Sequence, residues 1–299
     1  MGTADVIPGV SGGTMAFILG IYPDLVRAIR SFDYLWLKSL LTLDGQSMFG
    51  RPHFGFLLPL LTGIFCALMF FTRVIPLPEL LIEYPEQIYG LFFGLITGSI
   101  IVMFQDMRSL DLKAALPLMV GIILGALVFN MVPTATPEAA WFIFLSGALA
   151  ICAMILPGIS GSFILLILNK YAYIFNAIGY FKIGILLPFA LGAITGLAVF
   201  SRILHYLLRR FYRNTVLFII GMLLASLWVI WPFQNRIYET IAGKPRLLES
   251  IPYFPVAYDV QVISASILMV IGFIIVFMLN RFAMMKTVDS VNIRGPSQY

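Results

Sequence analysis

Six apolar stretches, each about twenty residues long, constrain the fold of this 299-residue sequence more than any other feature. Because an apolar helix of about twenty residues matches the thickness of the hydrocarbon core of a bilayer, each stretch predicts a transmembrane helix. Only 11% of the residues are charged, whereas soluble domains carry about 25%. The expected fold class is therefore all-α, a polytopic integral membrane protein. The stretches cover residues 55–73, 87–105, 114–132, 184–201, 215–231 and 260–280.

Two further segments combine apolar helix with a break that contains proline, glycine and serine. The first break is "IPGVSGGT" (7–14) and the second is "LPGISGS" (156–162). Broken backbone inside a bilayer leaves N–H and C=O groups without partners unless protein or a water-filled cavity covers them. Each segment is therefore predicted to be a re-entrant helical hairpin, and the second is expected to contain helices over 139–155 and 163–178.

The two broken segments resemble each other, and the likeness continues downstream of them. Aligned without gaps, residues 7–22 and 156–171 are identical at seven of sixteen positions. Residues 55–73 and 184–202 are identical at eight of nineteen positions, including a proline, two glycines and the final arginine. Matched proline, glycine and arginine are harder to explain by chance than matched leucine in apolar sequence, so we predict a tandem duplication.

The duplication divides the chain into a first repeat, residues 1–137, and a second repeat, residues 138–299, which together form one domain. Each repeat holds one hairpin, over 2–30 or 138–180, followed by three of the apolar stretches. The counterpart of helix 139–152 would precede residue 1, so either the first hairpin lacks this limb or the chain starts late. No cleavable signal peptide is expected, because a glycine-containing, acidic stretch follows the first residue at once.

The distribution of charge predicts how the repeats are oriented. Residues 74–87, after the first matched span, contain three glutamates and no basic residue, whereas residues 202–213 contain four arginines and no acid. Because basic loops stay in the cytoplasm, the matched spans are predicted to cross the membrane in opposite directions. The result is an inverted-topology repeat, with one hairpin dipping in from each face. The balanced loop 232–259 is placed outside, and the tail from Arg281 is placed in the cytoplasm.

The two breaks offer the chemistry of an anion site. Inverted repeats place two similar half-sites near the bilayer midplane, as in secondary transporters. Exposed glycine amides and the start of the following helix suit phosphate or carboxylate, and hydroxyl groups add donors. The alternative is that these small residues only let helices pack closely. The candidate binding residues are Ser11, Gly12, Gly13, Thr14, Ser160, Gly161 and Ser162, and the hairpin breaks are formed by Pro8, Gly9, Pro157 and Gly158.

Charged residues near the breaks are further candidates. Arg73 and Arg202 end the two matched spans, where each could bind an anionic headgroup from its own side or only extend to the interface. Asp5 lies close to the first break, where it could couple transport to H⁺ or Na⁺ or be a surface residue. Asn169 and Lys170 are expected at the membrane interface.

The cysteines, the histidines and the net charge argue against disulfide-linked, metal-binding and nucleic-acid-binding functions. Cys66 and Cys152 lie in apolar stretches, so no disulfide is expected, and the two histidines lie at the edges of spans. With so few cysteines and histidines, we expect neither a metal site nor a cofactor. The net charge of +5 is interpreted as a topology signal and not as a sign of nucleic-acid binding.

The stretch "GTADVIPGVSGGTMAFILGIY" (2–22), together with "LPGISGSFILLIL" (156–168), closely resembles a bacterial membrane family, formerly a domain of unknown function. That family is now identified as polyprenyl-phosphate transporters of the PopT type, and the likeness covers nearly the whole chain. The resemblance implies a flippase that returns undecaprenyl phosphate, a C55 lipid carrier for envelope synthesis, from the outer to the inner leaflet of the bacterial cytoplasmic membrane. It implies membrane lipids as surroundings and leaves a homodimer open. Ion-coupled alternating access is expected from the inverted repeats and from Asp5.

Two alternatives belong to other classes. Undecaprenyl-pyrophosphate phosphatases also combine Pro-Gly-x-Ser motifs with inverted repeats, but there an arginine follows the serine and a glutamate-rich motif lies in the membrane. Here glycine follows both Ser11 and Ser160, and no paired glutamate motif lies inside a span. Without these groups hydrolysis is hard to catalyse, so no catalytic residue is assigned. The second alternative is a secondary transporter of a small soluble anion.

Overall fold

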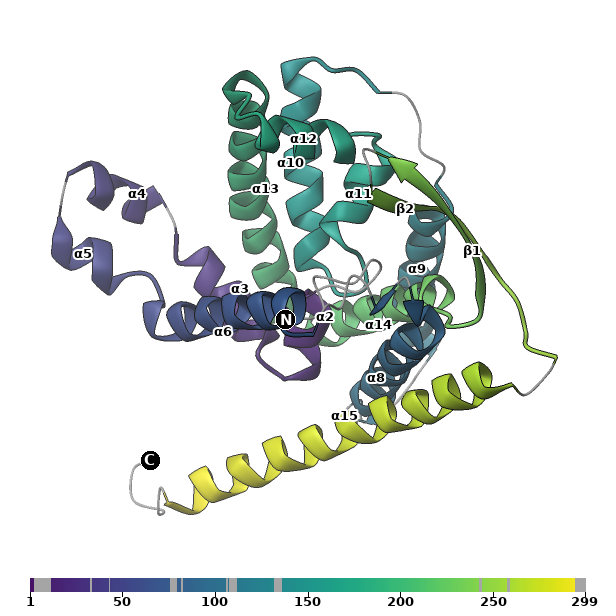
Figure 1. Ribbon diagram of the computed structural model, residues 1–299. Helices are drawn as coiled ribbons and strands as arrows, with labels where there is room; N and C mark the ends of the chain where they lie inside the picture. Colours follow the sequence, from purple (N-terminus) through teal and green to yellow (C-terminus); the bar gives the residue numbers. More distant parts are fainter. Residues whose placement is uncertain are drawn as a thin grey trace. The chain divides into compact units, whose positions relative to one another are not determined.

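The computed structural model of the chain is built mainly of helices (Figure 1). Five described helices are long and apolar enough to cross a membrane. The protein is therefore an all-α polytopic membrane protein, as the apolar stretches predicted. The structure describes residues 1–2, 12–32, 34–42, 44–75, 80–81, 83–105, 107, 112–131, 136–241, 244–256 and 259–293.

All six predicted spans are helical in the structure. Five of them, α6, α8, α13, α14 and α15, have the length of a span, and α9 is a shorter apolar helix. In the first part of the chain the helices are α2 (Gly12–Ile18), α3 (Tyr22–Arg30), α4 (Tyr34–Leu41), α5 (Gly45–Gly50), α6 (Phe54–Arg73), α8 (Pro85–Gln105) and α9 (Leu112–Phe129). In the second part they are α10 (Ala140–Ile155), α11 (Gly161–Ile167), α12 (Tyr171–Gly179), α13 (Ile183–Arg210), α14 (Tyr212–Val229) and α15 (Val260–Ile293).

A β-hairpin occupies much of the segment that was expected to be a loop. Strands β1 (Gln234–Ile241) and β2 (Lys244–Pro252) pair in antiparallel fashion, with an irregularity between Ile237 and Tyr238. The loop prediction was based on balanced charge. Charge indicates on which side of the membrane a segment lies, but it does not indicate the secondary structure of that segment. The β-branched and aromatic residues of β1 favour a strand, so the signal was present in the sequence.

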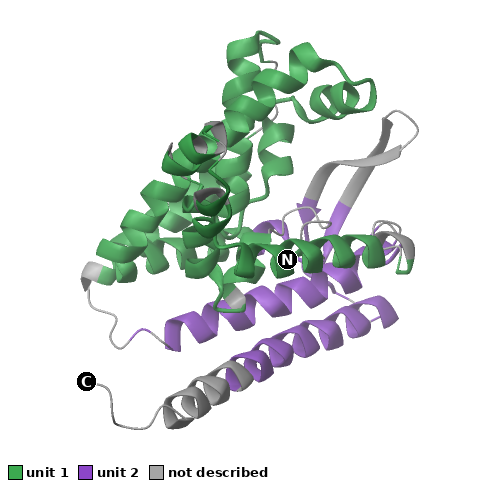
Figure 2. Ribbon diagram, turned by 90° about the vertical axis from the view of Figure 1, so that its left-hand side faces the viewer, with its two compact units in different colours: residues 1–77, 109–226 green, residues 78–108, 227–299 purple. Residues whose placement is uncertain are grey.

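The described helices form two compact units, which Figure 2 distinguishes by colour. Unit 1 comprises residues 1–77 and 109–226, and unit 2 comprises residues 78–108 and 227–299. Each unit contains helices from both predicted repeats. The units therefore do not coincide with the repeats, and the duplication stays a prediction.

In unit 1, α10 and α13 lie side by side (Figure 1). Glycine permits this close approach at two points: an added Cβ on Gly147 would lie 2.2 Å from the carbonyl oxygen of Phe189, and one on Gly192 would lie 1.9 Å from that of Phe144. Helix α3 packs against both α13 and α6. Its buried face includes Tyr22, which is 0% exposed.

In unit 2, α8 and α15 lie side by side over much of their length. The side chain of Gln87 donates to the hydroxyl of Ser264 at 3.1 Å across this pair. The two helices also approach closely at glycines, among them Gly94 on α8 and Gly272 on α15. The segment that follows α14 is fixed by Trp231, whose ring nitrogen donates to the carbonyl of Tyr253 at 3.0 Å.

Two helix pairs, α9–α14 in unit 1 and α8–α15 in unit 2, have the same kind of contact. In each pair, a glycine of either helix faces a main-chain carbonyl of the other, and an added Cβ would lie between 1.9 and 2.3 Å from the oxygen. By the predicted duplication, α8 corresponds to α14 and α9 to α15. The pairs of glycine and carbonyl are Gly94–Met269 and Gly272–Leu91 in unit 2, and Gly221–Leu118 and Gly121–Phe218 in unit 1.

Candidate functional site

The two predicted hairpins, residues 2–30 and 138–180, are called the motif segments, and their described parts fold alike. Helices α2 and α11 each contain seven residues, and α3 and α12 each contain nine. Between them the backbone turns left-handed, with a φ of 69° at Gly20 and 53° at Asn169. In the second segment the two helices meet at an angle of 111°. The continuous helix predicted over 163–178 is therefore wrong, because asparagine tolerates the left-handed conformation that interrupts a right-handed helix.

The second break connects α10 to α11 and presents two hydroxyl groups. Gly158 has a φ of 96°, a conformation that residues with a side chain rarely adopt. The Oγ of Ser160 accepts from the amide of Phe163 at 3.2 Å and thereby caps α11. The same atom lies 3.0 Å from the Oγ of Ser162, and Ser162 is exposed. The serine pair therefore extends from the buried break to the surface.

The second break lies against the first motif segment. The hydroxyl of Thr14 accepts from the amide of Gly158 at 2.8 Å, and the hydroxyl of Tyr22 donates to the carbonyl of Ile155 at 3.1 Å. Both side chains are 0% exposed. Two buried hydrogen bonds thus join segments that are 144 and 133 positions apart in the chain.

Two glycines of the candidate site pack directly on backbone. An added Cβ on Gly13 would lie 2.6 Å from the carbonyl oxygen of Ile155, and one on Gly161 would lie 2.6 Å from that of Ala150. Real Cβ atoms do not come this close to backbone, so both contacts depend on glycine. Close packing, the alternative interpretation of the motif, accounts for these two residues. Their part in binding an anion stays a prediction.

Among the described contacts, none joins Arg202 to the serine pair, and the side chain of Arg73 lies outside the described part of the structure. Arg73 is the last residue of α6, and Arg202 is exposed within α13, which continues to Arg210 instead of ending at residue 201. This helix extends because basic residues in its last turn are favourable at the negative end of the helix dipole. Gly12, the first residue of α2, and Pro157 in the second break are both buried. Four candidates lie outside the described residues: Asp5, Pro8, Gly9 and Ser11.

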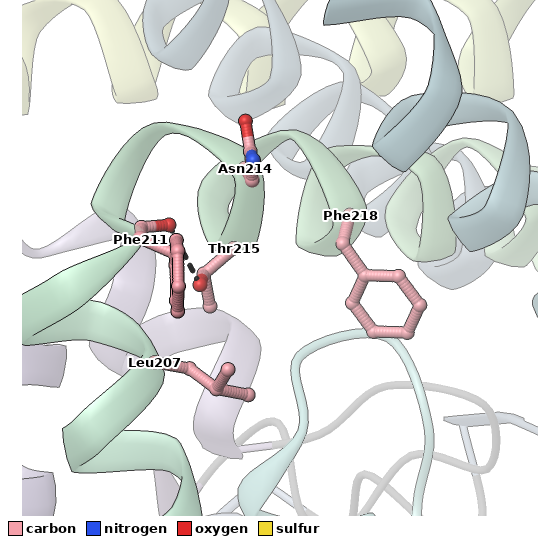
Figure 3. A pocket seen from close by; sticks show the side chains of 5 residues that line it. All are labelled: Leu207, Phe211, Asn214, Thr215 and Phe218. Carbon is pink, nitrogen blue, oxygen red and sulfur yellow. Dashed lines mark hydrogen bonds between the residues drawn. The ribbon is translucent and has the colours of Figure 1, made fainter.

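A pocket lies at the junction of α13 and α14 (Figure 3). Its volume is about 250 Å³. Thr215 donates to the carbonyl of Phe211 at 2.9 Å, and Phe218 packs against a cluster that contains Ile159 of the second break. One lining residue of the pocket, Phe218, is therefore also part of the packing around the second break. The sequence did not predict this pocket, because the pocket is formed only where two helices meet at a turn in the folded protein. Its lining residues are Leu207, Phe211, Asn214, Thr215 and Phe218.

Comparison with known proteins gives the family. Residues 1–246 match the family described as VCA0040-like, undecaprenyl phosphate translocase-like. The chain belongs to this family. The polyprenyl-phosphate transporter of Vibrio cholerae serotype O1 is 40% identical over 237 residues, which are 79% of this chain and 76% of that protein. The polyprenyl-phosphate transporter of Staphylococcus aureus is 28% identical over 253 residues, which are 78% of this chain and 83% of that protein. No solved structure matches the chain.

The match confirms the family resemblance that the two motifs predicted. The match does not assign roles to single residues of this translocase-like chain. Two features of the chain's structure were not predicted from its sequence. One is the direct hydrogen bonding between the motif segments. The other is the burial of Lys170, which is 2% exposed; its expected place at the membrane interface stays a prediction. A lysine between two apolar helices gives no sequence signal that separates a buried position from an exposed one.

Replacement of Thr14 by valine should destabilise this translocase-like protein, because it leaves the buried amide of Gly158 without its partner. An unsatisfied buried donor costs about 1–3 kcal/mol. Thermal unfolding in detergent should therefore show a lower melting temperature for Thr14→Val. Thr14→Ser keeps the hydroxyl and should lie much closer to the wild type. Equal melting temperatures for valine and wild type would contradict the assigned hydrogen bond.

Proposed function

We propose that this chain carries the phosphate headgroup of undecaprenyl phosphate across the bacterial cytoplasmic membrane. The observation that carries the proposal is the junction of the two motif segments, where Thr14 and Tyr22 bond to the second break beside the hydroxyls of Ser160 and Ser162. Family membership supports the substrate class. A charged phosphate in hydrocarbon is prohibitively unfavourable without donors, and hydroxyl groups at a covered break replace part of its hydration shell.

The transport mechanism in this proposal is alternating access. If the repeats are inverted, the two motif segments occupy equivalent places and exchange their conformations, so that the headgroup meets one face and then the other. The direction proposed is from the outer to the inner leaflet, with the C-terminus in the cytoplasm. The prenyl tail stays in lipid, which agrees with a chain in which only 11% of residues are charged. Asp5 is the proposed group for coupling to H⁺ or Na⁺.

The proposal does not include hydrolysis. Both motif serines are followed by glycine, so each lacks the adjacent arginine with which a membrane phosphatase would hold its phosphate. Purified protein should therefore release no phosphate from undecaprenyl pyrophosphate. Phosphate release above that of empty vesicles would favour the enzyme. Competition by inorganic phosphate, without any effect of prenyl lipids, would favour a transporter of small anions.

Leaflet-resolved transport in vesicles tests the proposal directly. Labelled undecaprenyl phosphate is placed in one leaflet and its arrival in the other is followed for the wild type and four alanine variants. At least one variant in each predicted repeat should lose about tenfold or more in rate, because a charge-assisted hydrogen bond to phosphate is worth at least that factor. Wild-type transport rates in all four variants would contradict the proposed binding site. The variants are Ser11→Ala, Arg73→Ala, Ser160→Ala and Arg202→Ala.

A further inference from the structure

A buried ammonium group lies at the bend between α11 and α12. Lys170 immediately precedes α12, and only 2% of the residue is exposed. Its Nζ donates to the carbonyl of Thr136 at 2.9 Å. The same atom lies 5.7 Å from the ring centroid of Phe142 and 5.5 Å from that of Tyr173. The charge is therefore held by one carbonyl and two aromatic faces.

These partners stabilise the cation without neutralising it. An ammonium group has three donors, and the structure gives Lys170 one hydrogen bond. Aromatic faces attract a cation, but more weakly than a carboxylate does. In the described part of the chain, no carboxylate lies within ion-pairing distance of Lys170. Buried charges in proteins are normally paired, so this lysine lacks the anion that its environment favours.

Its surroundings place this cation just below the surface. Thr136, Phe142 and Tyr173, which surround the ammonium, are each partly exposed, so only one layer of side chains separates the charge from the surface. Lysine carries its ammonium on a flexible four-carbon stem, so a change of rotamer can turn the charge toward a ligand. In membrane proteins, a buried ionisable residue within an apolar segment generally marks a path for a charged substrate.

We propose that Lys170 is a capture site for a phosphate monoester, occupied before the headgroup reaches the serine pair. The inference rests on the proposed function and names a further binding residue for it. Helix α11 has seven residues and is therefore about 10 Å long, so Lys170 and Ser160 lie at its opposite ends. A headgroup bound at Lys170 has one helix length to travel before it reaches the hydroxyls of the second break.

The first motif segment has no such cation. At the matching position it has Ile21, followed by Tyr22 where the second segment has Tyr171. The backbone is the same in both, since Ile21 and Lys170 each donate their amide to the carbonyl five residues earlier. The lysine is therefore not required for this turn to form. If the repeats are inverted, the capture site belongs to one face of the membrane only.

Vesicle transport with variants of Lys170 tests the inference. Lys170→Met removes the charge and keeps a similar length, and it should raise the KM for undecaprenyl phosphate about tenfold while kcat changes little. Lys170→Arg keeps the charge and should stay close to the wild type. The matched control is Lys182→Gln, because Lys182 lies near the end of the same hairpin over the ring of Tyr180 and is exposed. A lysine with only a structural role would lower the amount of folded protein and leave KM unchanged.

Binding to purified protein in detergent distinguishes the sources of the phosphate. The probes are undecaprenyl phosphate, undecaprenol and inorganic phosphate. The wild type should bind the phosphate lipid about tenfold more tightly than the alcohol, and Lys170→Met should lose this preference. Inorganic phosphate that displaces the lipid would identify a soluble anion as the ligand of this site.

A further variant keeps the inference testable if Lys170→Met does not fold. Tyr173→Leu removes one aromatic face and retains the lysine, so the ammonium is freer to meet a phosphate and the KM should fall. An unchanged or higher KM in Tyr173→Leu would overturn the inference, as would a wild-type KM in folded Lys170→Met. A wild-type protein that moves no lipid would instead refute the proposed function, and the binding measurements would still report on Lys170.

Discussion

Replacement of Gly13 by valine is expected to reduce lipid transport to the background of empty vesicles. The added Cβ would lie 2.6 Å from the carbonyl oxygen of Ile155 and 3.1 Å from that of Met154. Both atoms belong to backbone at the end of α10, so no flexible side chain can move aside. Forcing extra atoms into packed structure costs about 1–3 kcal/mol or more. The first motif segment must therefore move away from the second break.

This displacement would remove both buried hydrogen bonds between the motif segments. Thr14 follows Gly13 directly and bonds to Gly158, and Tyr22 bonds to Ile155 itself. Each donor or acceptor would then be buried without its partner, which adds to the cost of the clash. The effect on transport should therefore exceed the effect of removing the hydroxyl of Thr14 alone.

The matched control for this variant is Gly63→Val. Gly63 lies within α6, and an added Cβ there would meet no atom within 4 Å. Both substitutions replace a helical glycine by valine, so the main difference between them is the contact with backbone that Gly13 makes and Gly63 does not. Leaflet-resolved transport by Gly63→Val should stay near the wild type. Transport by Gly13→Val at the same rate would mean that the motif segments need not touch.

The helices of this protein could be predicted from its sequence because a bilayer imposes a length on them. Apolar runs of about twenty residues leave little choice of structure in lipid. For the same reason the break at 156–162 could be located, since proline and glycine interrupt an otherwise continuous helix. The end of α13 was placed too early, because its last turns contain arginine and histidine and are no longer apolar.

The candidate site could be predicted only in part. Pattern matching found both motif segments, yet it could not reveal that the hydroxyl of Thr14 meets the amide of Gly158. That contact depends on the tertiary fold and leaves no periodicity in the sequence. The burial of Lys170 was missed for the same reason. The turn at Asn169 could have been found, because the matching position in the first segment is a glycine.

Replacement of Gly94 by valine is expected to have a large effect on stability. The added Cβ would lie 1.9 Å from the carbonyl oxygen of Met269 and 3.0 Å from its Cα. Helices α8 and α15 would have to separate along their contact, which is the main packing within unit 2. A cost of about 3 kcal/mol or more corresponds to a melting temperature lower by about 5–10 °C. Thermal unfolding in detergent measures it, with Gly63→Val as the control.

The counterpart of this variant, Gly221→Val, tests whether the predicted duplication governs the packing. An added Cβ on Gly221 would lie 2.3 Å from the carbonyl oxygen of Leu118, so the clash is of the same kind within unit 1. If α8–α15 and α14–α9 are two copies of one ancestral contact, both variants should lose stability by similar amounts. A stable Gly221→Val beside a destabilised Gly94→Val would show that the likeness of the two contacts is only geometric. The packing of a helix from one repeat against a helix from the other would then reflect local packing alone and not the duplication.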